Sequence, residues 1–286
     1  MKHKHISKLA LAAVFWFFSC TSVERDNCLD SGGINYMKCQ LSLSSSSVEL
    51  SSSSVEPSSS SDEPSSSSSL IQTGIIHGTP VHYEDEIYNT VVIGTQTWMA
   101  RNLNYAVSGS KCGGTGTSIL DNDMTDDNTA TCDAYGRLYD WATAMALPPS
   151  CNSSTCEVES NHKGICPDGW HIPSDAEWTT LTRFVGRTSG TKLMATSDLC
   201  PYDYSVNKKG TDIYGFAALP GGCGNCYSPD DSNKTNYVCQ SGYWWTASET
   251  GIGNAYYLGI GSTSDGSAWR QDVQKNSFYS VRCLKN

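Results

Sequence analysis

A serine-rich segment limits where this chain can fold. Residues 44–69 contain runs of four, four, four and five serines, and only three apolar side chains and two prolines lie between the runs. The runs recur every seven residues, but a coiled coil needs an apolar seam that this composition does not supply. Such a segment cannot bury enough apolar surface to offset its ordering entropy. We therefore predict a disordered linker over residues 44–73, with an end-to-end distance of roughly 30 Å.

The N-terminus has the three parts of a secretory signal. A basic start is followed by an apolar run from Leu9 to Phe18, and the small residue Ser19 comes next. Ten helical residues span roughly 15 Å, about half of a bilayer's hydrocarbon core, so the run is too short to cross a membrane. We predict that residues 1–19 are a signal peptide.

Cys20 is the predicted point of membrane attachment. The tetrad Phe17-Phe18-Ser19-Cys20 resembles the lipobox of bacterial lipoproteins, in which the cysteine is acylated and becomes the new N-terminus. The alternative is ordinary cleavage nearby, which would leave Cys20 as a free thiol. Two or more acyl chains hold a protein stably on a bilayer. The resemblance therefore implies a lipid-anchored protein at the outer membrane or cell surface.

The cysteine content agrees with export. The chain has 13 cysteines, and setting Cys20 aside leaves 12. Exported chains keep disulfides, whereas cytosolic chains rarely do. Cys28 and Cys39 lie in a small segment over residues 20–43, and we expect them to bond to each other. Cys223 and Cys226 have the spacing of a redox motif, but their Gly-rich surroundings favour structural disulfides with each other, with Cys239 or with Cys200.

The charge of the chain argues against nucleic acid as a partner. The whole sequence carries a net charge of −10 from 19 basic and 29 acidic residues. Removing the three lysines of the signal leaves 16 basic residues, and 16 minus 29 gives −13. Such a surface repels phosphate backbones, and no local basic cluster stands out.

The remaining residues, 75–286, suit a single α+β domain with its own core. The clearest helix begins with a capping box, in which Ser174 is the N-cap and Glu177 reaches back, and it ends at Gly186. Trp178, Leu181 and Phe184 fall on one face of this helix, as does Val185. Further elements are predicted as a β-hairpin over 87–100, a second helix over 138–147, and strands over 243–248, 255–260 and 280–284.

Five segments resemble one known family. In sequence order they are YNTVVIGTQTWMARNLNY (88–105), YGRLYDW (135–141), CPDGWHIPSDAEW (166–178), GYWWTASE (242–249) and SVRC (280–283). The set resembles the Fibrobacter succinogenes major paralogous domain family and covers nearly all of residues 84–286. That family is similar in turn to C-type-lectin-like domains. No settled activity comes with the resemblance.

The resemblance implies a particular architecture. The C-type-lectin-like fold has small mixed or antiparallel sheets, two helices and long disulfide-bonded loops, and its two termini meet in one small sheet. It also implies a disulfide between a cysteine near the second helix and one in the last strand, and Cys166 and Cys283 fit those places. A bond that closes a loop of over a hundred residues contributes up to roughly 4–5 kcal/mol in the chain-entropy model.

A short acidic loop is the best candidate for a metal site. Calcium takes six to eight oxygen ligands from a flexible loop. Asp121, Asp123, Asp126 and Asp127 could supply several of these oxygens, but the glycine and terminal glutamate of an EF-hand are missing. A solvated acidic loop is the preferred interpretation. We expect no other cofactor.

The candidate binding residues lie in the C-terminal third. Tryptophan rings stack on sugar faces and anchor protein interfaces, which makes Trp244, Trp245 and Trp269 candidates together with Glu249. A place in the core is the preferred interpretation for each tryptophan. Side chains alternate along a strand, so one of Trp244 and Trp245 should be buried. His171 is expected to be a structural hydrogen-bonding residue.

Three functions remain open, in a stated order of preference. The first is a non-catalytic binding or adhesion module at the cell surface, with a polysaccharide or another protein as its ligand. The second is a structural envelope protein without a ligand. The third is an enzyme that acts on an extracellular polymer, with Glu249 and Asp265 as an acid–base pair.

Overall fold

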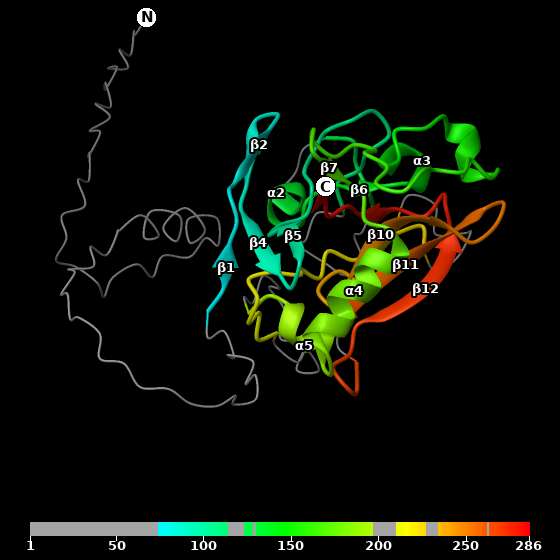
Figure 1. Ribbon diagram of the computed structural model, residues 1–286. Coiled ribbons are helices and arrows are strands. Elements are labelled where there is room, and N and C mark those ends of the chain that lie inside the picture. The colour runs from blue at the N-terminus through cyan, green and yellow to red at the C-terminus, as the bar shows by residue number, and fades with distance from the viewer. Residues whose placement is uncertain (1–73, 114–122, 128–129, 197–209, 227–233, 262) are drawn as a thin grey trace, which may run out of the picture. The chain divides into compact units, whose positions relative to one another are not determined.

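The computed structural model describes residues 74–113, 123–127, 130–196, 210–226, 234–261 and 263–286. The predicted signal peptide (1–19), N-terminal segment (20–43) and linker (44–73) lie outside these residues, and so do Cys20, Cys28 and Cys39. Within the described part of the chain the fold is α+β, with short helices and several small sheets (Figure 1). The α+β class predicted from the sequence is confirmed.

The first sheet brings the beginning and the end of the domain together. All its neighbouring strands are antiparallel, and Trp98 of β5 lies opposite Leu284 of β14. The predicted hairpin over 87–100 is present, and Gly94 makes its turn at φ 62°. In spatial order the strands are β1 (Ile76–His77), β4 (Thr90–Ile93), β5 (Gln96–Met99), β14 (Leu284–Lys285) and β7 (Trp170–His171).

The second sheet contains the long strands of the C-terminal third. Its pairs are antiparallel except for β10 and β13, which run parallel. The strand β12 forms one edge, and its side chains are mostly exposed. In spatial order the strands are β12 (Trp269–Gln274), β11 (Asn254–Gly261), β10 (Ser241–Glu249), β13 (Tyr279–Ser280) and β6 (Leu138–Tyr139).

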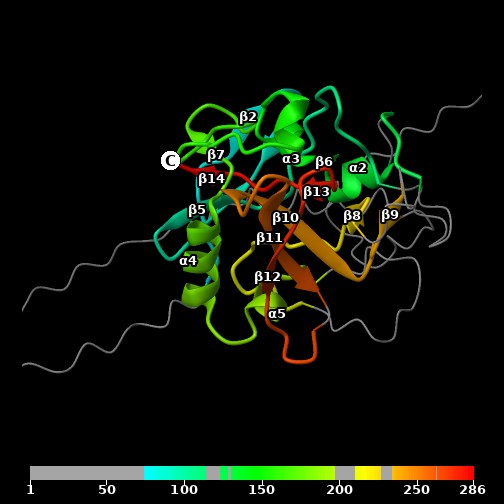
Figure 2. The ribbon, with the colours of Figure 1, turned by 90° about the vertical axis from the view of Figure 1, so that its right-hand side faces the viewer.

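Two small hairpins and five short helical segments complete the described domain. The hairpins pair β2 (Val81–Tyr83) with β3 (Glu86–Tyr88), and β8 (Cys223–Gly224) with β9 (Thr235–Asn236). The helical segments are α2 (Ala130–Tyr135), α3 (Trp141–Ala144), the 3₁₀ turn η1 (Pro149–Asn152), α4 (Asp175–Val185) and α5 (Ser189–Leu193). The helices α3 and α5 lie at opposite ends of the second sheet (Figures 1 and 2).

The helix α4 forms where the capping box predicts it. The Ser174 hydroxyl accepts a hydrogen bond from the Glu177 backbone N–H, and the Glu177 carboxylate accepts one from the Ser174 N–H at 2.7 Å. Trp178, Leu181 and Val185 are buried against β10 and β11, and the helix ends at Gly186. Phe184 differs from the prediction because its side chain is 56 % exposed.

The predicted helix over 138–147 is wrong at both ends. Leu138 and Tyr139 form β6 and pair with Ser280 and Tyr279 of β13. The helix α3 begins only after Asp140, whose carboxylate accepts a hydrogen bond from the Thr143 N–H at 2.7 Å. Pairing with a strand more than 130 residues away therefore overrides the local helical preference.

Other differences concern short strands. The strand predicted over 280–284 is two strands, β13 and β14, which belong to different sheets. The strands predicted over 243–248 and 255–260 are confirmed as β10 and β11. The edge strand β12 and the helices α2 and α5 are elements that the sequence interpretation missed.

Two apolar clusters hold the described domain together. The smaller cluster lies beneath α4, where the Trp98 and Trp178 ring centroids are 4.5 Å apart and Trp244 also packs. The larger cluster lies on the opposite side of β10 and includes Tyr139, Trp245 and Tyr279. Both sides of β10 are therefore covered, which explains why Ser241–Ala247 is a continuous run of buried residues.

Candidate functional site

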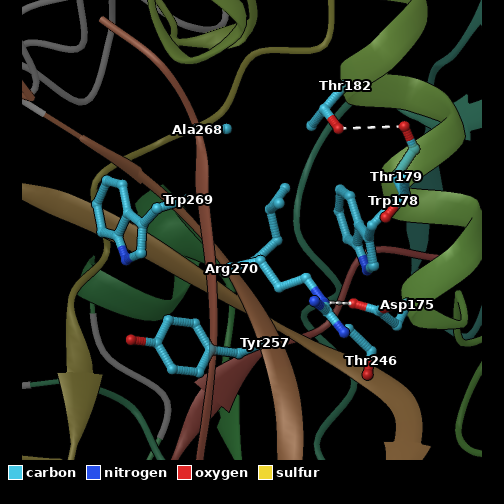
Figure 3. Close-up of a pocket in the computed structure, with 10 residues that line it drawn as sticks. Asp175, Trp178, Thr179, Thr182, Thr246, Tyr257, Ala268, Trp269 and Arg270 are labelled. Atoms are coloured by element: carbon cyan, nitrogen blue, oxygen red, sulfur yellow. Dashed lines mark hydrogen bonds and ion pairs between the residues drawn. The ribbon is translucent and has the colours of Figure 1, made fainter. Parts of the chain in front are cut away.

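A groove between α4 and the edge of the second sheet is the strongest candidate site. Its volume is about 160 Å³. Residues from α4, β10, β11 and β12, together with Ala268 just before β12, line it. They are Asp175, Trp178, Thr179, Thr182, Thr246, Tyr257, Leu258, Ala268, Trp269 and Arg270 (Figure 3). Four separate elements therefore border one small space.

Asp175 forms the helical side of the groove's charged rim. It is the first residue of α4, and its backbone N–H donates to the Ser248 hydroxyl at 3.1 Å. The side chain is 20 % exposed. The capping box at Ser174 and this bond to β10 together fix where the carboxylate lies.

Arg270 approaches from the edge strand. Antiparallel pairing places it opposite Leu258 of β11. Its guanidinium carbon lies 3.8 Å from the ring centroid of Tyr256, and its Nε donates to the Asp175 carboxylate across the groove (Figure 3). Burial alone would lower the pKa of Arg270, but the ion pair with Asp175 outweighs it and raises that pKa, so the side chain stays charged.

Two of the three aromatic residues that line the groove, Trp269 and Tyr257, face away from the helix. Figure 3 shows Trp269 and Tyr257 extending to the opposite side of the sheet from Asp175 and Arg270. There Trp269 packs edge-on against Tyr243, with ring centroids 5.9 Å apart, and the Tyr257 hydroxyl donates to Gln271 at 2.9 Å. These two residues therefore border the groove without offering an aromatic face to its interior.

A second polar cluster continues along the same face of β11 and β12. Asp272 lies opposite Tyr256 in the register, two residues from Arg270. Its carboxylate accepts hydrogen bonds from the Asn254 amide at 3.0 Å and from the Thr250 hydroxyl at 3.3 Å, and all three groups lie at the surface. Carboxylate, amide, hydroxyl and guanidinium groups therefore lie in sequence along one face.

The predicted binding residues Trp244 and Trp245 are both in the core. Each is 0 % exposed, and each indole N–H donates to a buried acceptor, Trp244 to Asn102 and Trp245 to the Tyr139 carbonyl. Neither ring can reach a ligand, because α4 covers one side of β10 and the larger cluster covers the other. Of the three tryptophan candidates, only Trp269 is partly exposed.

Glu249 is committed to a structural ion pair. It binds the ammonium group of Lys275, whose side chain is 0 % exposed and which also donates to the Cys151 and Ser154 carbonyls at 3.1 and 3.0 Å. The Glu249 carboxylate also accepts hydrogen bonds from the backbone N–H groups of Cys156 and Glu157. These contacts hold the loop that the Cys151–Cys156 disulfide closes.

The structure separates Glu249 from Asp265. Glu249 lies opposite Ala255 at one end of β11, and Asp265 follows Gly261 at the other end. Six strand residues at about 3.3 Å each place roughly 20 Å between those ends. Paired carboxylates in glycosidases are about 5 to 9.5 Å apart. The acid–base pair considered from the sequence is therefore wrong.

The acidic loop offers no assembled calcium site in its described part. Asp123 pairs with Lys234 at 2.6 Å and Asp126 with Lys111 at 2.5 Å, while Asp127 is an exposed neighbour. Asp121 lies outside the described residues. Among the residues that the structure describes, no group of three or more His, Cys, Asp or Glu side chains could hold a metal ion.

The disulfides link distant and local parts of the domain. Cys166 and Cys283, the pair implied by the family resemblance, are bonded across a sequence separation of 117. Cys223 and Cys226 are bonded to each other in a strand and its following turn, without the helix N-terminus that a redox thiol uses. Two further bonds join Cys112 to Cys132 and Cys151 to Cys156, and Cys239 is also disulfide-bonded.

His171 connects β7 to the start of α4. It is 2 % exposed, and its two ring nitrogens contact Asn286 Oδ1 at 2.7 Å and Glu177 Oε1 at 2.9 Å. Burial lowers the pKa of His171, but the hydrogen bonds with Glu177 and Asn286 outweigh it and raise that pKa. The contacts are those of a structural residue, as the sequence interpretation expected.

The sequence interpretation missed the residues that form the groove's charged rim. Asp175 follows the predicted N-cap Ser174 as a helix residue, and Arg270 lies beyond the end of the strand predicted over 255–260. Only Trp269 and Val273 are apolar in β12, and the polar, exposed Gln271 lies between them, so the period-two signal of this strand is incomplete. The pairing of Arg270 with Asp175, 95 residues apart, has no local signal.

The fold and the groove together define a disulfide-bonded α+β domain with a small polar site beside its longest helix. The chain belongs to the Fibrobacter succinogenes major domain family, whose profile matches residues 91–285. No curated protein and no solved structure matches the chain. Within the described residues, no helix combines the length and the apolar character needed to cross a bilayer.

Proposed function

We propose that this chain is a cell-surface lipoprotein whose C-terminal domain binds polysaccharide without cleaving it. The groove beside α4 is the observation that carries the proposal. Its rim pairs Asp175 with Arg270, its α4 wall presents the hydroxyls of Thr179 and Thr182, and the adjoining cluster adds an amide and a carboxylate. Sugars are recognised by such combinations because each hydroxyl both donates and accepts hydrogen bonds.

The same groups argue for binding rather than catalysis. General acid–base work on a glycosidic bond needs two carboxyl groups on either side of that bond. Of the residues that line the groove, Asp175 alone carries a carboxylate, and Arg270 neutralises it. The other pair considered, Glu249 and Asp265, lies at opposite ends of β11.

The disulfides support export. Four bonds are present among described cysteines, and such bonds persist in oxidising compartments outside the cytosol. In this proposal residues 1–19 direct export, Cys20 carries the lipid anchor, and residues 44–73 form the spacer that holds the domain away from the outer membrane. The antiparallel meeting of β5 and β14 and the Cys166–Cys283 bond support a C-type-lectin-like fold.

Binding is tested by retention of the purified full chain on insoluble polysaccharides, with cellulose, xylan and pectin as separate arms and an outer-membrane extract as the protein arm. We expect saturable retention on at least one polysaccharide. A reduced and alkylated sample of the same chain is the matched control, and it should not be retained. Retention on the membrane extract alone would replace polysaccharide with a protein ligand. No retention in any arm would favour a structural envelope role.

The anchor is tested separately from the ligand. Mass spectrometry of the protein from its native membrane should show an N-terminal acylated Cys20, and protease added to intact cells should remove residues 75–286. Replacing Cys20 with Ser should release the protein from the membrane. A full-length, unacylated chain that is soluble inside the cell would contradict this part of the proposal.

A further inference from the structure

Arg270 is fixed in place more firmly than an ordinary exposed arginine. Its backbone pairs with Leu258, its guanidinium lies over Tyr256 at 3.8 Å, and its Nε binds Asp175. Asp175 holds one edge of the guanidinium plane and Tyr256 covers one of its faces. A side chain held in this way loses little further conformational freedom when it binds a ligand. The side chain is nevertheless 45 % exposed.

The geometry of the guanidinium leaves a second edge for recognition. A guanidinium has five N–H donors in one plane, and the bond to Asp175 uses the Nε side. The two terminal nitrogens form the other side of the fork, which matches the two oxygens of a planar carboxylate. The Arg270 side chain as a whole is 45 % exposed, and the proposal places the ligand on its exposed part.

The surroundings disfavour a doubly charged ligand and offer polar partners for hydroxyl groups. Asp175 and Asp272 lie beside Arg270, so a doubly charged phosphate monoester would be repelled more than a single carboxylate. The Asn254–Asp272 pair, which is bonded at 3.0 Å, offers both a donor and an acceptor to ligand hydroxyls. The groove volume of about 160 Å³ is below the roughly 300 Å³ of a drug-sized pocket, which suits one sugar ring.

We propose that this site recognises the carboxylate of a uronic acid residue in a polysaccharide, with Arg270 as the specificity-determining residue. The inference rests on the proposed polysaccharide-binding function and adds the class of sugar. The carboxylate binds the terminal nitrogens of Arg270, while Asp175 and Tyr256 keep the guanidinium in place. The ring hydroxyls reach Thr179 and Thr182 on one side and Asp272 on the other.

The test measures calorimetric binding of the full oxidised chain to four soluble probes. The probes are an oligogalacturonate, the same oligomer fully methyl-esterified, a neutral xylo-oligosaccharide and a sulfated galactan oligomer. We expect the oligogalacturonate to bind and its ester to bind at least tenfold more weakly, because the ester removes a charge-assisted pair of hydrogen bonds. The sulfated and neutral oligomers should also bind at least tenfold more weakly.

Two variants and a control test whether Arg270 is the residue that recognises the carboxylate. Arg270→Gln should weaken oligogalacturonate binding at least tenfold, and Arg270→Lys, which keeps the charge without the fork, should weaken it at least threefold. Arg183→Gln is the matched control, since Arg183 is an exposed arginine of α4 that does not line the groove. Near-ultraviolet circular dichroism shows whether each variant is folded, and the ester comparison on the unmodified chain needs no variant.

The outcomes separate this inference from the proposed function. Equal binding of the oligogalacturonate and its ester, or unchanged binding by a folded Arg270→Gln variant, would overturn the uronate inference and leave polysaccharide binding in place. Preference for the sulfated oligomer would also overturn it. Failure of every oligosaccharide to bind, together with no retention on the insoluble polymers, would overturn both.

Discussion

The side chains of Arg282 and Asn102, 180 residues apart in sequence, bind each other at the buried centre of the domain. Arg282 donates to the Asn102 side-chain oxygen from Nε at 3.1 Å and from Nη2 at 2.5 Å, and the Trp244 indole donates to the same oxygen at 2.7 Å. Further bonds run from Arg282 to the carbonyls of Met99, Phe216 and Ala217. Burial lowers the pKa of this arginine to about 9, which still leaves it protonated at neutral pH.

Replacing Arg282 with Lys should destabilise the domain by about 3 kcal/mol or more. A lysine keeps the charge but cannot supply the planar set of donors, so buried acceptors on at least two segments lose their partners at about 1–3 kcal/mol each. Urea unfolding of the oxidised protein measures the difference. Arg183→Lys on the exposed side of α4 is the control and should change the free energy of unfolding by less than about 0.5 kcal/mol. Equal stability of the two variants would contradict the central role of Arg282.

The long-range Cys166–Cys283 disulfide should contribute more to the free energy of unfolding than a short-range disulfide does. Replacing Cys166 and Cys283 together with Ser should cost about 4 to 5 kcal/mol, because their bond closes a sequence separation of 117. Replacing Cys223 and Cys226, which are three positions apart, should cost about 2 kcal/mol in the same chain-entropy estimate. Urea unfolding of both double variants gives the comparison. A larger loss of stability in the Cys223/Cys226 variant than in the Cys166/Cys283 variant would contradict this prediction.

The buried Lys275–Glu249 pair should behave as a unit. Glu249→Gln should cost about 3 kcal/mol or more, because it leaves the fully buried ammonium without its carboxylate. Replacing both residues with Met and Leu should cost less than the single change, since no unpaired charge then remains. A double-mutant cycle from urea unfolding, with Lys275→Met, Glu249→Leu and the variant carrying both changes, measures the coupling. Independent, additive effects would show that the contact contributes little to stability.

The His171–Glu177 pair predicts a defined pH dependence. The pKa of His171 is raised above its ordinary 6.5, so its contribution is fully present below about pH 6.5 and is lost as the pH rises through the higher folded value. The pKa of Glu177 is lowered below 4.5 because its hydrogen bonds with His171 and Ser174 outweigh the opposing effect of burial. Its contribution is therefore present above about pH 4.5 and is lost on further acidification.

The pair should accordingly stabilise the domain most between about pH 4.5 and 6.5. In the His171→Gln variant, the decline in the free energy of unfolding above pH 6.5 should become shallower than in the unmodified protein. Thermal unfolding across pH 4 to 9 measures this difference. His162→Gln is the control, because His162 contacts the Met145 carbonyl and no carboxylate among the described residues. An unchanged pH profile in His171→Gln would contradict the assignment.

Features set by neighbouring residues were predictable from the sequence. The capping box at Ser174 and Glu177 places the start of α4, and the β-branched run around Gly94 gives the first hairpin. Both depend on interactions within a few residues, which the sequence shows directly. The Cys166–Cys283 pair came instead from the resemblance, because spacing alone cannot choose among many possible disulfide connectivities.

Features set by distant contacts were not predictable. Leu138 and Tyr139 read as the start of a helix, but they pair with β13 near the C-terminus. Trp244 and Trp245 are both buried because β10 has a packed layer on each side, which simple alternation does not indicate. Glu249 is a binding and acid–base candidate in the sequence, but the fold brings Lys275 against it. Arg270 and Asp175 likewise meet only in the folded domain.

The central claim is that the domain binds a uronate-containing polysaccharide without cleaving it. The most direct test follows binding and turnover together in one incubation. The purified full chain is equilibrated with an insoluble uronate-containing polysaccharide, and both the protein left in solution and the soluble sugars released are measured over several days. We expect saturable depletion of the protein from solution, with no release of sugar above a protein-free control. Arg270→Gln should lower the affinity for the polysaccharide at least tenfold. Release of sugar in proportion to the protein added, or no depletion at any concentration, would contradict it.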